Sequence, residues 1–288
     1  IRDRSPSRGL GDVYKRQILD QLVAAGVRHF SGMVGSTSAP YVGTLAQRND
    51  VRYIGIRPEQ VAAAMMDATA RLSGRPGCVM THGASGLLAA SLGITSSALD
   101  SVPMIALSTT QERQAMEKGW WQTTGVLGPL ADTAKWQTRV ERTDQAVGAV
   151  RRALRESVAG KPGVAQIDIP IDVSTDETGL DVLPPITNHR APLHRPWPDP
   201  AAVQQCGSLI RDAARPVILI GGGAAFSNAG DALIALAEKL HAPVVNTPTS
   251  RSVVPETHEL VLGPSCLLYT SDAADEGLGV DLGGRRII

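Results

Sequence analysis

Residues 51–81 decide the fold, and they read VRYIGI, then RPEQVAAAMMDATARLSG, then RPGCVMT. The first and last runs are short and apolar, as buried strands are. The middle run is long and rich in small apolar residues, and it begins with a single acid, Glu59. Gly74 follows it, where a left-handed helix C-cap favours glycine. This order predicts two parallel strands joined by a crossover helix.

The same alternation of short apolar strands and helices continues on both sides of this stretch. It predicts an α/β fold with a doubly wound parallel sheet and helices on both faces. We expect strands at 28–31, 51–56, 77–81, 103–108, 136–140 and 164–169. We expect helices at 18–25, 39–48, 59–73, 86–99 and 144–159, with a short helix near 125–132 after a polar loop.

A proline-rich segment separates this unit from a second one. Six prolines stand at 184, 185, 192, 196, 198 and 200 without any periodicity, which predicts a semi-rigid linker over 184–199. A helix (200–213), a strand (216–220), a glycine turn, a helix (228–240) and a strand (243–246) follow. We therefore expect a first domain over 18–183 and part of a second α/β domain over 200–265.

The two ends of the chain have the character of sequencing adapters. Residues 12–17 can be encoded by GATGTGTATAAGAGACAG, and the reverse complement of that string, read one base in, encodes residues 266–271, CLLYTS. Such an inverted repeat is typical of transposon-based adapters. The sequence thus predicts that 1–17 and 266–288 are not native, and such segments are set aside from fold reasoning.

Composition excludes several classes of partner. The chain of 288 residues is 43% hydrophobic and 19% charged, as globular proteins are, and its formal net charge is zero. It offers no basic patch for nucleic acid and no apolar run of about 18 residues for a membrane span. Cys78 and Cys206 are far apart, which suits neither a metal site nor a disulfide scaffold and favours a cytoplasmic location.

The strand–Glu59–helix–glycine–strand order closely resembles the pyrimidine-binding domain of thiamine-diphosphate enzymes of the acetolactate synthase type. The second unit resembles the start of that family's central domain, so the resemblance covers nearly all of 18–265. It implies thiamine diphosphate as cofactor, with Glu59 touching and activating its aminopyrimidine ring. It also implies a 2-oxo acid substrate and a homodimer or homotetramer with the active site between subunits.

Two glycine-rich turns extend the resemblance. Residues 32–38 are similar to the family's Gly-x-Pro-Gly loop, with Val34 in place of proline, which implies that Gly35 and Ser36 border the cofactor. The turn after strand 77–81 reads THGASG and resembles that of benzoylformate decarboxylases. There the resemblance implies that His82 faces the substrate as a proton shuttle and that Gly83 lies at the cofactor.

Gln122, in the run WWQTT, matches the family's Phe-Gln-Glu segment, which implies an active-site role. The paired tryptophans beside it are equally compatible with a core or a subunit contact. The Glu that normally follows is Thr123 here, and the His-His pair of pyruvate decarboxylases is absent. Carboligase and 2-oxo acid decarboxylase of the benzoylformate decarboxylase type therefore both stay open.

The family holds the diphosphate through Mg²⁺ on a Gly-Asp-Gly motif in a C-terminal domain. The chain has no such motif, so we expect the metal and diphosphate site to lie outside it. Some acetolactate synthases also hold FAD, but Gly221–Gly223 lacks the G-x-G-x-x-G spacing and does not predict it. A non-catalytic α/β binding module is the alternative, with Glu59 a helix N-terminal acid that interacts favourably with the helix dipole.

Overall fold

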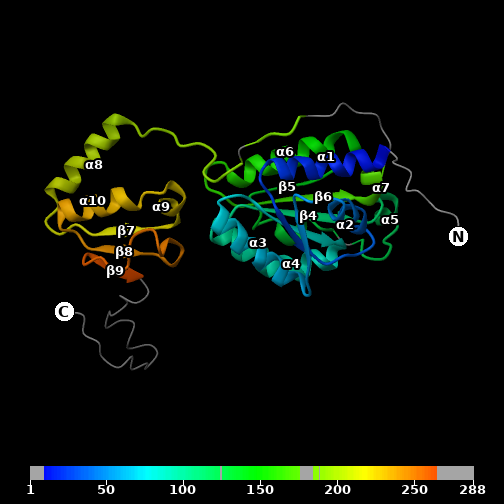
Figure 1. Cartoon of the computed structure of the whole chain (residues 1–288), viewed down its shortest axis with the longest axis horizontal. Coiled ribbons are helices and arrows are strands. Elements are labelled where there is room, and N and C mark those ends of the chain that lie inside the picture. Colours follow the sequence, from blue (N-terminus) through cyan, green and yellow to red (C-terminus); the bar gives the residue numbers. More distant parts are fainter. Residues whose placement is uncertain (1–9, 124, 176–183, 188, 265–288) are drawn as a thin grey trace, which may run out of the picture. The chain divides into compact units, whose positions relative to one another are not determined.

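The computed structural model describes residues 10–123, 125–175, 184–187 and 189–264 (Figure 1). The chain divides into two compact units, Ile1–His194 and Arg195–Ile288. The division lies inside the proline-rich segment 184–199. Each unit is described by itself below.

The first unit is built on a six-stranded sheet in which every pairing is parallel, as the sequence predicts. Its strand order is β2-β1-β3-β4-β6-β5, so the order reverses between β1 and β3. The three strands β3, β4 and β6 are buried along their whole length, which explains why apolar residues predominate in them. The strands are β1 (His29–Gly32), β2 (Arg52–Gly55), β3 (Gly77–His82), β4 (Met104–Thr110), β5 (Trp136–Arg139) and β6 (Val164–Pro170).

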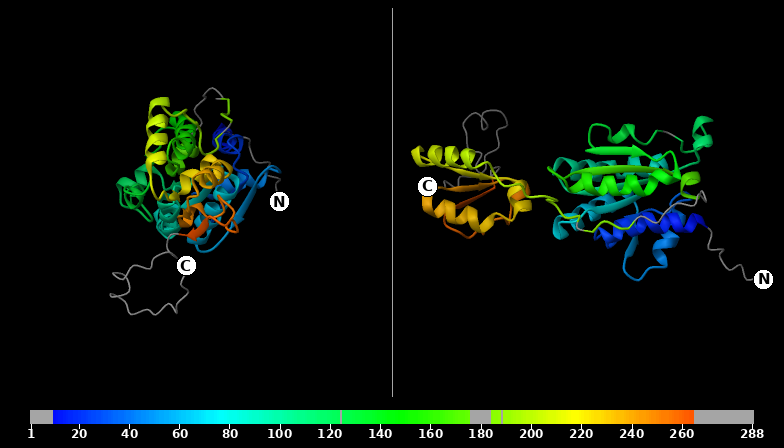
Figure 2. Two further views of the ribbon diagram at one scale, coloured as in Figure 1. Left: turned by 90° about the vertical axis from the view of Figure 1, so that its left-hand side faces the viewer. Right: turned by 90° about the horizontal axis from the view of Figure 1, so that it is seen from above.

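Helices cover both faces of this sheet (Figures 1 and 2). The helices α1 (Leu10–Ala24), α2 (Ala39–Ala46) and α6 (Thr143–Val158) share one apolar core with the sheet. The helices α3 (Glu59–Ser73) and α4 (Gly83–Leu99) share the other. The sheet is therefore doubly wound, as expected. Three short helices complete the unit: α5 (Arg113–Glu117), η1 (Gly128–Leu130) and α7 (Ile171–Thr175).

Helix α1 begins at Leu10, eight residues before the predicted start. Tyr14, Ile18 and Leu22 recur every four residues on one helix face, and all three are buried in the core. Setting residues 10–17 aside from the fold was thus wrong as a structural expectation. Whether they are native is a separate prediction that the structure does not test, and residues 266–288 lie outside the described part of the chain.

The second unit holds a smaller parallel sheet in the order β7-β8-β9. Its core is a small cluster around Ile220, Ala237 and Val244. Helix α8 buries none of its residues, and Leu219 in the sheet is 66% exposed. The elements are α8 (Pro200–Asp212), β7 (Ile218–Ile220), α9 (Gly222–Ser227), α10 (Gly230–Leu240), β8 (Val244–Asn246), η2 (Pro248–Ser250) and β9 (Val261–Pro264).

Candidate active site

Three of the predicted site residues lie at or just beyond the carboxyl ends of adjacent parallel strands. Gly35 follows β1, Glu59 follows β2, and His82 is the last residue of β3. The strand order reverses between β1 and β3, and open α/β sheets bind ligands in the crevice at such a point. Gly35 and Glu59 just beyond their strands, and His82 at the carboxyl end of β3, therefore lie where a ligand is expected.

Glu59 is the first residue of α3, and its side chain is only 6% exposed. Among the described residues its carboxyl group makes no hydrogen bond or ion pair. A Cβ atom added to Gly86 would stand 3.0 Å from Glu59 Oε1, so helix α4 approaches the carboxyl closely. The carboxyl oxygens are not among the fully enclosed unpartnered polar atoms of the described residues, so they open toward the site and can accept a hydrogen bond from a ligand.

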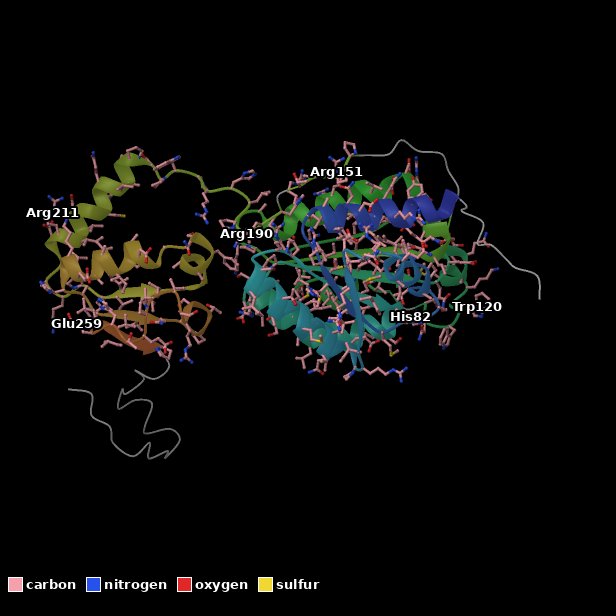
Figure 3. The ribbon with its side chains drawn as sticks, viewed as in Figure 1. His82, Trp120, Arg151, Arg190, Arg211 and Glu259 are labelled. Atoms are coloured by element: carbon pink, nitrogen blue, oxygen red, sulfur yellow. The ribbon has the colours of Figure 1, made fainter. Side chains whose placement is uncertain are left out.

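His82, labelled in Figure 3, is the N-cap residue of α4 and is 7% exposed. The Glu59 carboxyl is near enough for its charge to act on the imidazole. The His82 Nδ1 atom is 2.7 Å from Thr37 Oγ1, and the His82 ring centroid is 6.3 Å from that of Trp121. Burial lowers the pKa of His82, and this outweighs the opposing effects of the Glu59 charge and the Gln122 side chain. The imidazole is therefore neutral at pH 7 and able to exchange a proton.

Two glycines allow the backbone to approach these side chains. A Cβ atom on Gly35 would lie 2.1 Å from His82 Cγ, so any larger residue there would displace the ring. Gly83 has a φ of +61°, and a Cβ atom on it would lie 2.8 Å from Gln122 Oε1. Gln122 also donates from Nε2 to Ser85 Oγ at 3.0 Å. The turns after β1 and β3 thus close around His82 and Gln122.

The structure brings together five of the six predicted site residues, namely Gly35, Glu59, His82, Gly83 and Gln122. Ser36 lies in the same turn as Gly35 but is exposed and makes no hydrogen bond among the described residues. The roles assigned to all six stay predictions.

Thr37, which contacts His82, was not predicted as a site residue. Thr37 stands inside the glycine-rich run 32–38, but nothing local marks it as a partner of a residue 45 positions away. Trp121, also near His82, was considered only as core or subunit contact, although it lies next to Gln122.

Within the described residues, no group of histidine, cysteine, aspartate and glutamate side chains is arranged to hold a metal ion. The structural feature that fits a cofactor is instead the Glu59 carboxyl, which makes no hydrogen bond to the described residues. Gly35, Gly83 and Gly86 let the backbone lie close against His82, Gln122 and Glu59. In the same part of the chain, no helix is both long and apolar enough to cross a membrane.

A doubly wound parallel sheet with a buried carboxyl at its switch point defines the class: a ligand-binding α/β domain of enzyme type. Residues 13–128 match the thiamine pyrophosphate enzyme N-terminal TPP binding domain, and residues 203–279 match the central domain of the same enzymes. The chain belongs to the thiamine pyrophosphate enzyme family. Both matches run into the segments predicted to be non-native, and that prediction stays open.

Similar proteins carry several names within this family. A probable acetolactate synthase large subunit from Methanocaldococcus jannaschii is 32% identical over 85% of this chain and 42% of its own length. Mouse 2-hydroxyacyl-CoA lyase 1 is 28% identical over 92% of this chain and 44% of its own length. Oxalyl-CoA decarboxylase from Escherichia coli K12 is 30% identical over 75% of this chain and 39% of its own length. The chain thus spans less than half the length of these relatives.

Solved structures agree on the fold. The crystal structure of benzoylformate decarboxylase from Polynucleobacter necessarius superposes with a TM-score of 0.78, covering 87% of this chain and 46% of that one at 24% identity. A Rhodococcus jostii 4-hydroxybenzoylformate decarboxylase superposes with a TM-score of 0.74 at 20% identity, covering 87% of this chain and 47% of that one. At this identity the likeness establishes the fold alone.

Proposed function

We propose that this chain is the N-terminal and central part of a thiamine-diphosphate enzyme that decarboxylates a 2-oxo acid, ligates the resulting acyl unit to a second carbonyl, or does both. The observation that carries this proposal is the buried Glu59 carboxyl, which has no protein partner in the described residues and lies beside a neutral His82. Bound thiamine diphosphate would supply the carbon nucleophile and the electron sink.

Glu59 would hold the cofactor's pyrimidine ring through a ring nitrogen and exchange a proton with it. A carboxyl group suits this role because its proton can move to or from a nitrogen base over one hydrogen bond. Gly35, Ser36 and Gly83 would border the same ring, since the turns after β1 and β3 meet there.

His82 and Gln122 would face the substrate. A neutral imidazole takes up or releases a proton near pH 7, and an amide side chain orients a carbonyl or carboxylate by hydrogen bonding. The presence of His82 favours, as a second candidate, a decarboxylase of the benzoylformate decarboxylase type, in which the product must be protonated.

The diphosphate group would need Mg²⁺ from a part of the protein outside the described residues, because no metal-binding cluster is found within them. We also keep the cytoplasmic location as a prediction; Cys78 is buried and Cys206 exposed, and both are free thiols.

A homo-oligomer is part of this proposal. Large apolar side chains are exposed on α3 and α4, the two helices that flank Glu59: Val61, Leu72, Leu88, Leu92 and Leu99. Such a face indicates an interaction surface, and a second copy of the same helices would cover it symmetrically.

We expect Leu92→Glu to lower the molar mass in solution, measured by light scattering, because a buried charge opposes association. Leu209→Glu on α8 is the matched control: this leucine is 67% exposed, close to the 63% of Leu92, and lies in the other unit. A mass unchanged by Leu92→Glu would contradict the proposed interface.

The cofactor assignment is tested by titrating thiamine diphosphate, with Mg²⁺, into a longer protein that contains this chain and the downstream domain, by calorimetry. We expect saturable binding that weakens when Mg²⁺ is removed by a chelator. No binding by a folded longer protein would overturn the enzyme proposal and favour the non-catalytic module.

A further inference from the structure

The His82 ring is held by a buried network that the proposed function does not use. Thr37, 1% exposed, places its Oγ1 atom 2.7 Å from His82 Nδ1. The same Oγ1 atom donates to the carbonyl oxygen of Thr109 at 2.7 Å. Thr109 Oγ1 in turn donates to the carbonyl oxygen of Thr81 at 3.1 Å. The network therefore links the turn after β1 to the ends of β3 and β4.

Counting protons assigns the direction of the bond to His82. A threonine hydroxyl has one proton and can accept hydrogen bonds on its lone pairs. Thr37 Oγ1 contacts both the Thr109 carbonyl oxygen and His82 Nδ1 at 2.7 Å, and the Thr109 hydroxyl, 3.0 Å from it, can donate to the Thr81 carbonyl or to Thr37 Oγ1. Because the carbonyl only accepts, both 2.7 Å contacts are hydrogen bonds at once only if Nδ1 carries a proton.

Two interactions compete with this assignment. The Gln122 side chain raises the pKa of His82 and would favour a proton on the ring nitrogen that faces it, but Gln122 Oε1 makes no hydrogen bond among the described residues. The backbone N–H of Thr37 points at His82 Nδ1 over 3.4 Å, and it would favour a bare Nδ1. At 2.7 Å the hydroxyl contact is much shorter, whereas the N–H contact exceeds the usual donor–acceptor range of about 2.7–3.2 Å. The hydroxyl therefore decides which ring nitrogen carries the proton, so long as Thr37 is present.

We propose that Thr37 is a positioning residue that fixes neutral His82 in the Nδ1–H form and leaves Nε2 bare to accept a proton. In a proton exchange, Nε2 would gain a proton while Nδ1–H stays on Thr37 Oγ1, and the imidazolium would then return the Nε2 proton. The assignment of the tautomer stands on geometry alone, whereas its use in turnover rests on the proposed function.

The tautomer is measurable in the 288-residue chain without cofactor. The chain is labelled with ¹⁵N-histidine, and long-range ¹H–¹⁵N correlation spectra are recorded at about pH 8, where the neutral ring dominates. His82→Gln identifies the signals of His82 among the six histidines. We expect a protonated Nδ1 and a bare Nε2 at His82.

Two substitutions at position 37 distinguish an effect of the lost hydroxyl group from an effect of a disturbed fold. Thr37→Ser keeps the hydroxyl and should keep the Nδ1–H form. Thr37→Val keeps the shape but removes the acceptor, so the Nε2–H form should gain population as the backbone N–H takes over Nδ1. A wild-type ring in the Nε2–H form would overturn the proposal, as would an unchanged tautomer in a folded Thr37→Val variant.

A kinetic readout in the longer protein distinguishes this proposal from the proposed function. We expect Thr37→Val to lower kcat about tenfold or more with KM nearly unchanged, to shift the pH profile of kcat, and to be rescued by Thr37→Ser. The one charged group whose effect on the His82 pKa is resolved is Glu59, on α3. If the longer protein binds no cofactor, the proposed function is overturned, but the tautomer assignment is not. If a folded Thr37→Val variant turns over normally, the positioning role of Thr37 is overturned.

Discussion

The two units contain the same kind of parallel sheet but bury it to different degrees. In the first unit, the strands β3, β4 and β6 are buried throughout and helices cover both faces. In the second unit, Leu219 of β7 is 66% exposed and α8 buries no residue. Parallel sheets are usually covered on both faces, and among the described residues only the first unit shows this covering. The site residues all lie in the first unit.

Truncating one buried and one exposed leucine should give the largest difference in stability between the two units. Leu107→Ala in β4, at a fully buried position, should lower the free energy of unfolding by about 2–5 kcal/mol. Leu219→Ala in β7 should change it by no more than about 0.5 kcal/mol, because that side chain is already in water. Hydrogen exchange of the strand amides reports each unit separately during urea titration. Equal losses of unfolding free energy at the two positions would contradict the difference in burial between the two sheets.

A smaller difference concerns buried ionisable groups. Asp168 in β6 is fully buried, and burial raises its pKa to about 7, although the Arg139 charge opposes this. In the described part of the second unit no ionisable side chain is buried. The folded first unit thus binds a proton at Asp168 that the unfolded chain, with a pKa of about 3.9, has released.

This difference in bound protons makes the stability of the first unit depend on pH. Between about pH 4 and about pH 7 the folded state binds more protons at Asp168 than the unfolded state, so its contribution to stability falls as pH rises and then levels off. Asp168→Asn should therefore gain stability relative to wild type between about pH 5 and about pH 8. Chemical denaturation of both proteins across this range measures the difference.

Asp144→Asn provides the control for Asp168. Its neighbour Arg142 lowers the pKa of the Asp144 carboxyl, so this group stays ionised in both states above about pH 5 and should add no slope. If the stability difference between wild type and Asp168→Asn is the same at about pH 5 and at about pH 8, the claim that the buried Asp168 carboxyl binds a proton in the folded state is contradicted.

The sequence predicted most of the fold because local signals bracket the elements. Helix α3 spans 59–73 as predicted, since Pro58 precedes it and Gly74 caps it with a φ of +67°. The start of α4 was wrong by three residues, because its first residue, Gly83, has a positive φ and was taken as part of the turn. The short helices α5, α7 and α9 were not predicted, as they carry too few residues for a periodic pattern.

Only those site residues were predicted that can be recognised from the residues next to them in the sequence. Glu59 is the leading acid of a helix rich in small apolar residues, and His82 stands at the end of a strand, so both could be found. The link between Thr37 and Thr109 depends on the register that pairs His82 with Thr109 across β3 and β4. Such a contact between distant residues has no local signal, and only the folded chain reveals it.

The most direct test of the central claim is the turnover of 2-oxo acids by the longer protein carrying Glu59→Gln, compared with Glu117→Gln. Both changes remove one carboxylate from the first unit, but Glu59 is buried at the switch point and Glu117 is exposed on α5. The account predicts that Glu59→Gln lowers kcat about 10²–10⁴-fold, while Glu117→Gln leaves it unchanged. Wild-type turnover by Glu59→Gln would contradict the claim that this carboxyl activates the cofactor.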